Sequence, residues 1–128
     1  MRIMLKSKIH RATVTKSDAD YEGSIGIAAD LLEAANLLPY EQVHVLDITN
    51  GARLETYVIP ERSGSGTVAI YGAAARLVAE GDLVIILAYQ LLPESEAQRV
   101  TPAVVYVDEE NRPRSTASVT PVPEVASA

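Results

Sequence analysis

The 128-residue chain contains no cysteine, no phenylalanine and no tryptophan. Without cysteine it can form neither a disulfide nor a thiolate zinc site, which excludes the small disulfide-rich and zinc-ribbon classes. Only two histidines remain as nitrogen ligands, so we expect no bound metal. Tyrosine, present six times, is the only aromatic residue. The core must therefore be built from Val, Ile, Leu and Ala, a composition that favours pleated sheets.

Positive charge is also scarce, with 11 Lys and Arg against 17 Asp and Glu and a net charge of −6. Nucleic-acid binding depends on clustered basic residues, so we expect no nucleic-acid partner. The apolar run at the N-terminus is too short for a signal peptide or a membrane span, which predicts no membrane association and a cytoplasmic location. A chain of this length is expected to fold as one domain.

Hydrophobic alternation predicts a mostly β chain. One long, bent strand is expected over 2–15, further strands over 43–48, 53–59, 67–71, 83–89 and 103–108, and an acidic helical turn over 93–98. Between two of these strands, Asn50-Gly51 is typical of a hairpin turn. Beyond Asn111 the chain turns to Ser, Thr, Pro and Ala, so we predict a domain over 1–111 and a loose tail over 112–128.

One helix is predicted after Gly26. Ile27, Leu31, Ala34 and Leu38 recur at helical spacing, and Pro39 follows them. This pattern indicates one apolar face of a short amphipathic helix that packs on the sheet.

The segment Tyr21–Ser24 combines a flexible backbone with a hydroxyl. Glycine accepts conformations closed to other residues, so the Ser24 oxygen can reach the Gly23 carbonyl carbon and start an N-to-O acyl shift. Elimination and hydrolysis of the resulting ester would release ammonia and leave a pyruvoyl group. Taken alone, Gly-Ser is more often an ordinary turn, so it indicates chemistry only together with other signals.

On each of two predicted strands, polar side chains are an even number of residues apart and so project from one face. Lys8 and His10, with Ala12 beyond them, would project from one face and suit an anionic ligand; a solvated strand edge is the alternative. In the segment 53–59, Arg53 and Tyr57 share one face, while Thr56 lies on the other. A guanidinium could bind a carboxylate and a phenol could transfer a proton, although both are common on exposed sheets.

The segment Gly72–Ala75 consists of small residues that follow a predicted strand. Small side chains allow a ligand to approach backbone amides, which favour anions at the start of a helical turn. A tightly packed turn is the alternative.

Together these motifs closely resemble the aspartate 1-decarboxylase family. The resemblance runs from about Arg2 to Asn111 and rests on Met4–Thr15, Tyr21–Ser24, Thr49–Arg53, Thr56-Tyr57 and Gly72–Ala75. It implies a six-stranded double-psi β-barrel with short helices, assembled as a homotetramer with active sites between subunits. It also implies self-cleavage between Gly23 and Ser24, either spontaneous or assisted by a maturation helper protein.

The resemblance further implies that L-aspartate is decarboxylated to β-alanine and CO2 through a Schiff base, for pantothenate and coenzyme A synthesis. The cofactor would be a covalent pyruvoyl group derived from Ser24, with no external cofactor, and Tyr57 would protonate Cα. The implied substrate contacts are Arg53, Lys8, His10, Thr56, Gly72, Ala73 and Ala74.

One position departs from the family pattern, because Tyr71 stands where relatives commonly have Asn. We expect its hydroxyl to replace the amide as a hydrogen-bond donor to a nearby carbonyl. Two alternative functions stay open: a non-catalytic double-psi barrel that binds a partner, and a pyruvoyl decarboxylase for another acidic amino acid.

Overall fold

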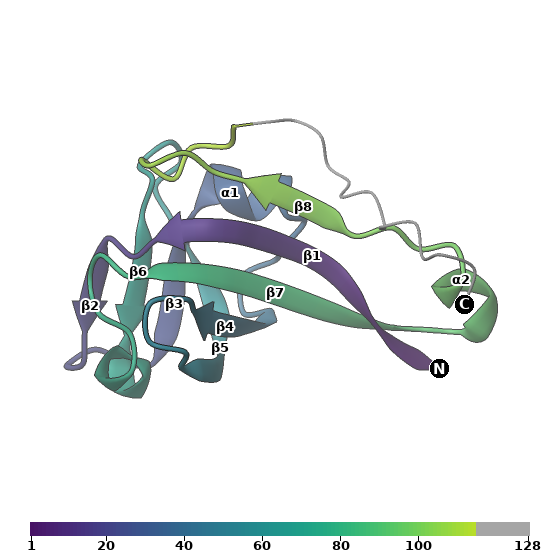
Figure 1. Ribbon diagram of the computed structural model, residues 1–128, viewed down its shortest axis with the longest axis horizontal. Helices are drawn as coiled ribbons and strands as arrows, with labels where there is room; N and C mark the ends of the chain where they lie inside the picture. The colour runs from purple at the N-terminus through teal and green to yellow at the C-terminus, as the bar shows by residue number, and fades with distance from the viewer. Residues whose placement is uncertain (115–128) are drawn as a thin grey trace.

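The computed structural model describes residues 1–114, and the predicted mostly β fold is confirmed. The elements in chain order are β1 Arg2–Thr13, β2 Lys16–Asp18, β3 Ser24–Ala28, α1 Ala29–Ala34, β4 Gln42–Asp47, β5 Arg53–Glu61, β6 Val68–Tyr71, the 3₁₀ helix η1 Gly72–Arg76, β7 Leu83–Leu92, α2 Glu94–Ala97 and β8 Ala103–Tyr106 (Figure 1). The predicted acidic turn is α2.

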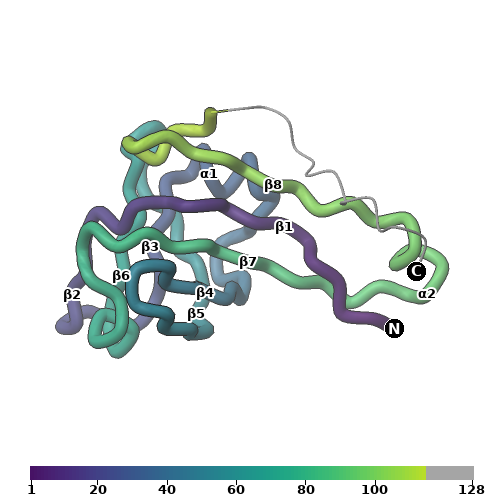
Figure 2. Tube along the Cα trace, viewed as in Figure 1, coloured from purple at the N-terminus to yellow at the C-terminus, as the bar shows by residue number. Residues whose placement is uncertain are grey.

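The described strands form one eight-stranded sheet in the order β2-β6-β3-β5-β4-β7-β1-β8. β1 and β7 form a long antiparallel ribbon, with β8 parallel to β1 along its other edge (Figure 2). At one end of this ribbon, β2, β3 and β6 run across it (Figure 1).

β1 confirms most of the strand predicted over 2–15, whereas β2 is a short strand that lies beyond the predicted bounds. At the bend, the Thr15 backbone N–H donates to the Val68 carbonyl at 2.8 Å, which brings β1 to β6. β2 follows β1 directly in the chain, yet it pairs with β6 at the opposite edge of the sheet. The sheet therefore curves back toward β1. The six strands predicted from the sequence are present, and the two further strands of the sheet are β2 and β3.

The core lies inside this curved sheet and is entirely aliphatic, as the composition requires. Its largest fully buried side chains come from six of the strands, from α1 and from two loop valines. They include Ile9, Ile25, Ile70, Ile86 and Leu31. β-branched side chains fit the pleated surface and fill it without aromatic rings.

A bulge in β1 places the Ala12 side chain on the face opposite to the one predicted. The register with β7 shifts between Ile9 and Ala12, and Arg11 has a positive φ of 64°. The extra residue turns Ala12 into the core beside Ile9, whereas Lys8 and His10 stay half-buried on the other face. Ala12 therefore does not continue the Lys8–His10 face, since a bulge reverses the alternation.

The helix predicted after Gly26 is wrong in its extent. Gly26 to Ala28 belong to β3, where Ile27 pairs with both β5 and β6, and α1 covers only Ala29–Ala34. Ala34 and Leu38 are exposed, so the predicted apolar face is not formed. The pairing of β3 with two strands outweighs the helical spacing.

The Asn50-Gly51 hairpin is confirmed. It joins the antiparallel strands β4 and β5, and Gly51 adopts the positive φ of 79° that such turns require. Asp47 begins the turn, and its Oδ1 accepts hydrogen bonds from the backbone N–H groups of Thr49 and Asn50. The turn thus leads directly into Arg53.

Asn111 ties the end of the described chain to the segments around Thr13 and Gly66, and Arg114 is still bonded to the Tyr106 carbonyl through its backbone N–H. Asn111 is 1% exposed, and its Nδ2 donates to the carbonyls of Thr13 and Gly66 at 2.7 and 2.8 Å. Most of the predicted tail, residues 115–128, lies outside the described residues. Within residues 1–114, neither helix is long and apolar enough to cross a membrane.

Candidate active site

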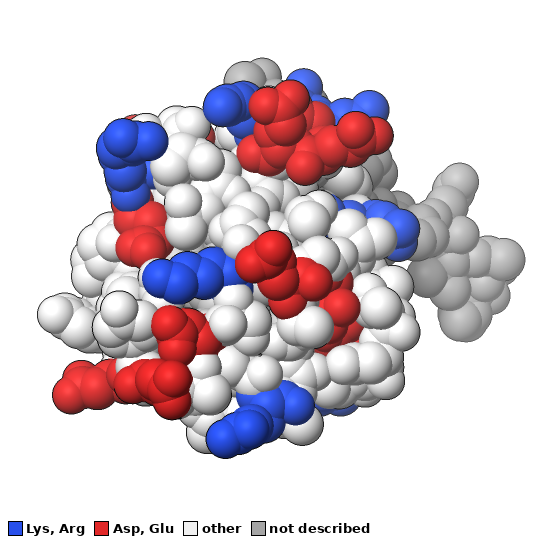
Figure 3. Space-filling view, turned by 90° about the vertical axis from the view of Figure 1, so that its left-hand side faces the viewer, with Lys and Arg blue, Asp and Glu red and all other residues white. Residues whose placement is uncertain are grey.

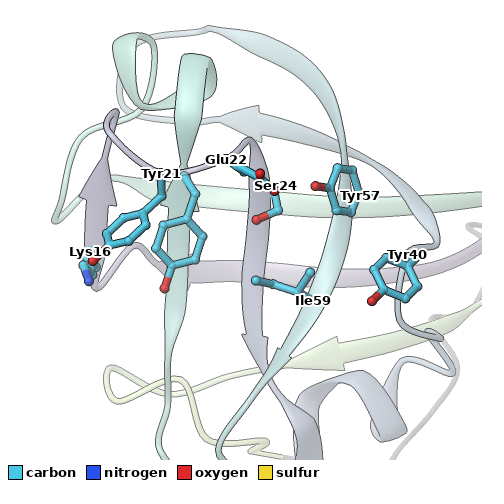
Figure 4. Close-up of a pocket in the computed structure, with 8 residues that line it drawn as sticks. Lys16, Tyr21, Glu22, Ser24, Tyr40, Tyr57 and Ile59 are labelled. Atoms are coloured by element: carbon cyan, nitrogen blue, oxygen red, sulfur yellow. The ribbon is translucent and has the colours of Figure 1, made fainter.

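Ser24 is the first residue of β3, directly after the bend at Gly23. It is 4% exposed, and it pairs in register with Tyr71 of β6. Its side chain lines a pocket of about 580 Å³ together with Lys16, Tyr21, Glu22, Tyr40, Tyr57, Ile59 and Tyr71. Figure 4 shows Ser24 between Tyr21 on one side and Tyr57 on the other.

Gly72 packs directly against the residue before Ser24. Gly72 has a φ of 76°, and a Cβ added there would lie 2.5 Å from the Gly23 Cα. Only glycine fits this position, because any side chain would displace the backbone at Gly23. Ala73 and Ala74 follow in η1, as the predicted helical turn requires, and their side chains leave the backbone accessible.

Tyr57 reaches the same pocket from β5. Its side chain is 37% exposed, and its ring lies 6.3 Å from that of Tyr40, measured between centroids. Thr56 points to the opposite face of β5, as the alternation predicts. Of the predicted catalytic pair, the structure therefore brings Ser24 and Tyr57 together, while Thr56 faces away.

Arg53 lies in a different pocket of about 530 Å³, which it lines with His44, Leu46, Leu54 and Glu55. His44 Nε2 is 3.7 Å from Glu55 Oε1, so a carboxylate of the chain already neighbours the imidazole. Within one chain Arg53 does not line the pocket of Ser24.

Lys8 and His10 are also separate from Ser24. They lie on β1, where the His10 ring meets the edge of Tyr106 at 5.7 Å between centroids. Burial and the nearby charges of Lys8 and Arg11 lower the pKa of His10, which favours a neutral imidazole. His10 Nδ1 is buried without a hydrogen-bond partner in residues 1–114.

The sequence-based prediction missed several side chains of the Ser24 pocket. Four of the chain's six tyrosines line it, among them Tyr21 and Tyr40, and Lys16 is its only cation. The tyrosines are spread evenly along the sequence, so their meeting in one pocket leaves no local signal. Lys16 and Tyr40 carried no positional signal, because both lie in polar segments whose approach to Ser24 depends on the tertiary fold.

The Tyr71 hydroxyl donates to Glu61 Oε1 at 2.9 Å rather than to the carbonyl that we expect. Burial, followed by the hydrogen bond to Glu61 and its charge, raises the pKa of Tyr71 to about 12. The phenol is therefore protonated at neutral pH and acts as a donor.

The pocket thus combines a buried serine after a glycine, a phenol and a single cation. A sequence model described as "Aspartate decarboxylase" matches residues 1–114. The chain belongs to the aspartate decarboxylase family. This confirms the resemblance, and it makes the chain an enzyme of the carboxy-lyase class that acts on aspartate.

On the face shown in Figure 3, acidic and basic side chains lie in small groups separated by uncharged surface. The described residues also hold no cluster of three or more His, Asp or Glu able to bind a metal ion.

Proposed function

We propose that this aspartate decarboxylase cuts itself between Gly23 and Ser24, and that Ser24 becomes its pyruvoyl group. The observation that carries the proposal is the position of Ser24. It begins β3 at the wall of the 580 Å³ pocket, next to a glycine that Gly72 holds from the other side. A hydroxyl held beside the carbonyl of the preceding residue is the arrangement that an acyl shift needs.

The cleavage uses the chain's own atoms. The Ser24 hydroxyl attacks the Gly23 carbonyl carbon, the C–N bond breaks, and an ester replaces the peptide bond. Loss of the Ser24 α-proton then expels the Gly23 carboxylate and leaves a dehydroalanine. Water converts its imine tautomer to the ketone and releases ammonia. The products are residues 1–23 and a chain that begins with a pyruvoyl group at position 24.

The residues around Ser24 fit such a group. Ser24 is only 4% exposed, and Ile59 adds an apolar side chain to the wall of the pocket beside it. The chemistry that a pyruvoyl group supplies is an electron sink of the Schiff-base type, which accepts the electrons left when CO2 departs. Tyr57, in the same pocket, donates the proton that Cα of the product requires.

Substrate binding needs a second subunit. Arg53 and Tyr57 lie four residues apart on β5, about 13 Å along the strand, and within one chain they line different pockets. We therefore propose that Arg53, Lys8 and His10 act on the Ser24 pocket of a neighbouring subunit in a homotetramer. Thr56 and the Gly72–Ala74 backbone complete the proposed substrate contacts.

The product, β-alanine, would enter pantothenate and coenzyme A synthesis in the cytoplasm. Cleavage proceeds either spontaneously or with a maturation helper protein, and incubation of the purified precursor alone distinguishes the two.

The direct test is to combine intact-mass analysis of the purified protein with assays of L-aspartate and L-glutamate. We expect two fragments that meet between residues 23 and 24, with release of β-alanine from L-aspartate. Faster turnover of L-glutamate would favour a decarboxylase for another acidic amino acid. An uncut chain without activity would favour a non-catalytic binding module.

A further inference from the structure

A cluster of four side chains lies beside the Gly23–Ser24 bond. The Tyr71 hydroxyl donates to Glu61, and the Tyr71 ring meets the Tyr21 ring edge-on at 5.7 Å between centroids. Lys16 Nζ lies 5.3 Å from the centre of the Tyr21 ring and 5.7 Å from that of Tyr71. The cluster thus joins β5, β6, β2 and the loop that precedes Ser24.

Glu61 reaches Tyr71 across the strand that Ser24 begins. β3 lies between β5 and β6 in the sheet, so a side chain from β5 must pass over β3 to reach β6. It passes at Gly26, where an added Cβ would lie 2.9 Å from both Cγ and Cδ of Glu61. The missing side chain at position 26 is therefore what makes room for the Glu61–Tyr71 hydrogen bond.

Both sides of the proposed cleavage site are connected to this hydrogen bond. On one side, Tyr71 pairs in register with Ser24 and is followed by Gly72, which packs on Gly23. On the other side, Tyr21 packs against the Tyr71 ring and lies two residues before Gly23. Movement of Tyr71 would shift the backbone on both sides of the bond.

We propose that Glu61 and Tyr71 form a brace across β3 that positions Tyr21 and Gly72 on either side of the Gly23–Ser24 bond. The brace makes Tyr71 a positioning residue for self-cleavage, and this inference rests on the function proposed above. Glu61 holds Tyr71, and Tyr71 holds the two segments that fix the distance between the Ser24 hydroxyl and the Gly23 carbonyl.

The chemistry of the pair suits this role. A hydrogen bond from a hydroxyl to a carboxylate is stronger than one between neutral groups, and this one is partly buried. The raised pKa of Tyr71 keeps its proton in place at neutral pH. Reactions between held groups depend steeply on their separation, so a small relaxation of the loop slows the acyl shift.

The test follows newly synthesised full-length chain by intact mass as it converts to two fragments. We expect Tyr71→Phe and Gly26→Ala each to slow conversion by about tenfold, because each breaks the same charged hydrogen bond. Gly26→Ala changes neither Tyr71 nor Glu61, and its backbone φ is open to alanine. Tyr89→Phe, a tyrosine of β7 whose ring contacts His44, is the matched control and should convert at the parent rate.

A rescue separates positioning from a general loss of stability. Glu61→Gln retains an acceptor for the Tyr71 hydroxyl, so it should convert faster than Glu61→Ala. The double variant Tyr71→Phe/Glu61→Gln should be no slower than Tyr71→Phe alone, since both changes remove one interaction. The midpoint of thermal unfolding identifies any variant that fails to fold. If Gly26→Ala is such a variant, the comparison of the double variant with Tyr71→Phe still tests the brace.

Conversion of Tyr71→Phe at the parent rate would overturn the brace while the proposed function stands. Equal slowing by Glu61→Gln and Glu61→Ala, or additive slowing in the double variant, would also overturn it. A parent chain that never converts, either alone or with a maturation helper protein, would refute cleavage at Ser24 and the brace with it.

Discussion

The Ser24 pocket and the Arg53 pocket lie on the same chain but differ in how their side chains are held. Ser24 is buried, and the residues before and opposite it are fixed by Gly72 and by the Tyr71–Glu61 hydrogen bond. Arg53 is exposed on β5 and shares its pocket with an exposed Glu55. Cleavage of one bond within the chain needs groups preorganised by that chain, whereas a cation at the surface is available to a neighbouring subunit.

β5 connects the two pockets. Alternation along this strand places Arg53 and Tyr57 on one face, yet they line different cavities because of the distance between them. Variants along β5 and at Ser24 can therefore separate cleavage from substrate turnover.

Ser24→Ala should have the largest effect, since it removes the hydroxyl that starts the acyl shift and becomes the ketone. We expect neither cleavage nor release of CO2 from L-aspartate, as measured by intact mass and a decarboxylation assay. Ser63→Ala, which changes an exposed loop serine, should match the parent in both. Product formation by Ser24→Ala would show that catalysis does not need a group made from Ser24, and the contrast between the Ser24 and Arg53 pockets would then fail.

Tyr57→Phe should leave cleavage intact and slow decarboxylation by about 10²-fold, the usual loss when a general acid is removed. The reason is that Tyr57 lines the Ser24 pocket from β5, whereas the turn that packs on Gly23 is Gly72, directly after β6. Cleavage rate and kcat are measured on the same preparation, with Tyr89→Phe as control. A near-normal kcat would mean that a group other than Tyr57 donates the proton.

Arg53→Gln should also leave cleavage intact but lower kcat/KM for L-aspartate by about tenfold or more, because a charged hydrogen bond to the substrate carboxylate is lost. The effect should appear mainly in KM. Arg62→Gln, at an exposed loop position, serves as the control. If Arg53→Gln blocked cleavage instead, the two pockets would not be functionally separate.

Asp47→Asn probes the turn that leads into Arg53 and should have the smallest effect. Asp47 is 2% exposed, and its Oδ2 is buried without a hydrogen-bond partner among residues 1–114; burial, and then the neighbouring Asp82 carboxyl group, raise its pKa. A raised folded-state pKa contributes stability that is complete below the unfolded value of about 3.9 and is lost as pH rises through the folded value.

An amide at position 47 needs no proton to donate to Asp82 and keeps the acceptor for Thr49 and Asn50. Asp47→Asn should therefore increase the free energy of unfolding at pH 7 by about 1 kcal/mol, with a smaller gain at pH 4. Thermal unfolding at both pH values measures this. A gain that is larger at pH 4 would contradict the assigned pKa direction.

The strands and the hairpin could be predicted because their signals are local. Alternation identified β5 with its two faces, and Asn50-Gly51 identified the turn before it. The motif resemblance selected Ser24 and Tyr57, which the structure then places in one pocket.

The errors and omissions involve features that depend on distant parts of the chain. The bulge at Arg11 reversed the parity of Ala12 through pairing with β7, and Ile27 became part of a strand because β5 and β6 flank it. The bond between Glu61 and Tyr71 depends on the space at Gly26, a contact between three strands that no local pattern records.

The central claim is that the chain makes its own catalytic group from Ser24, and intact-mass analysis of the purified parent tests it most directly. The account predicts two fragments, residues 1–23 and 24–128, with the second lighter by one NH3 than a serine-headed fragment and blocked to N-terminal sequencing. A single uncut chain with full aspartate decarboxylase activity would contradict it.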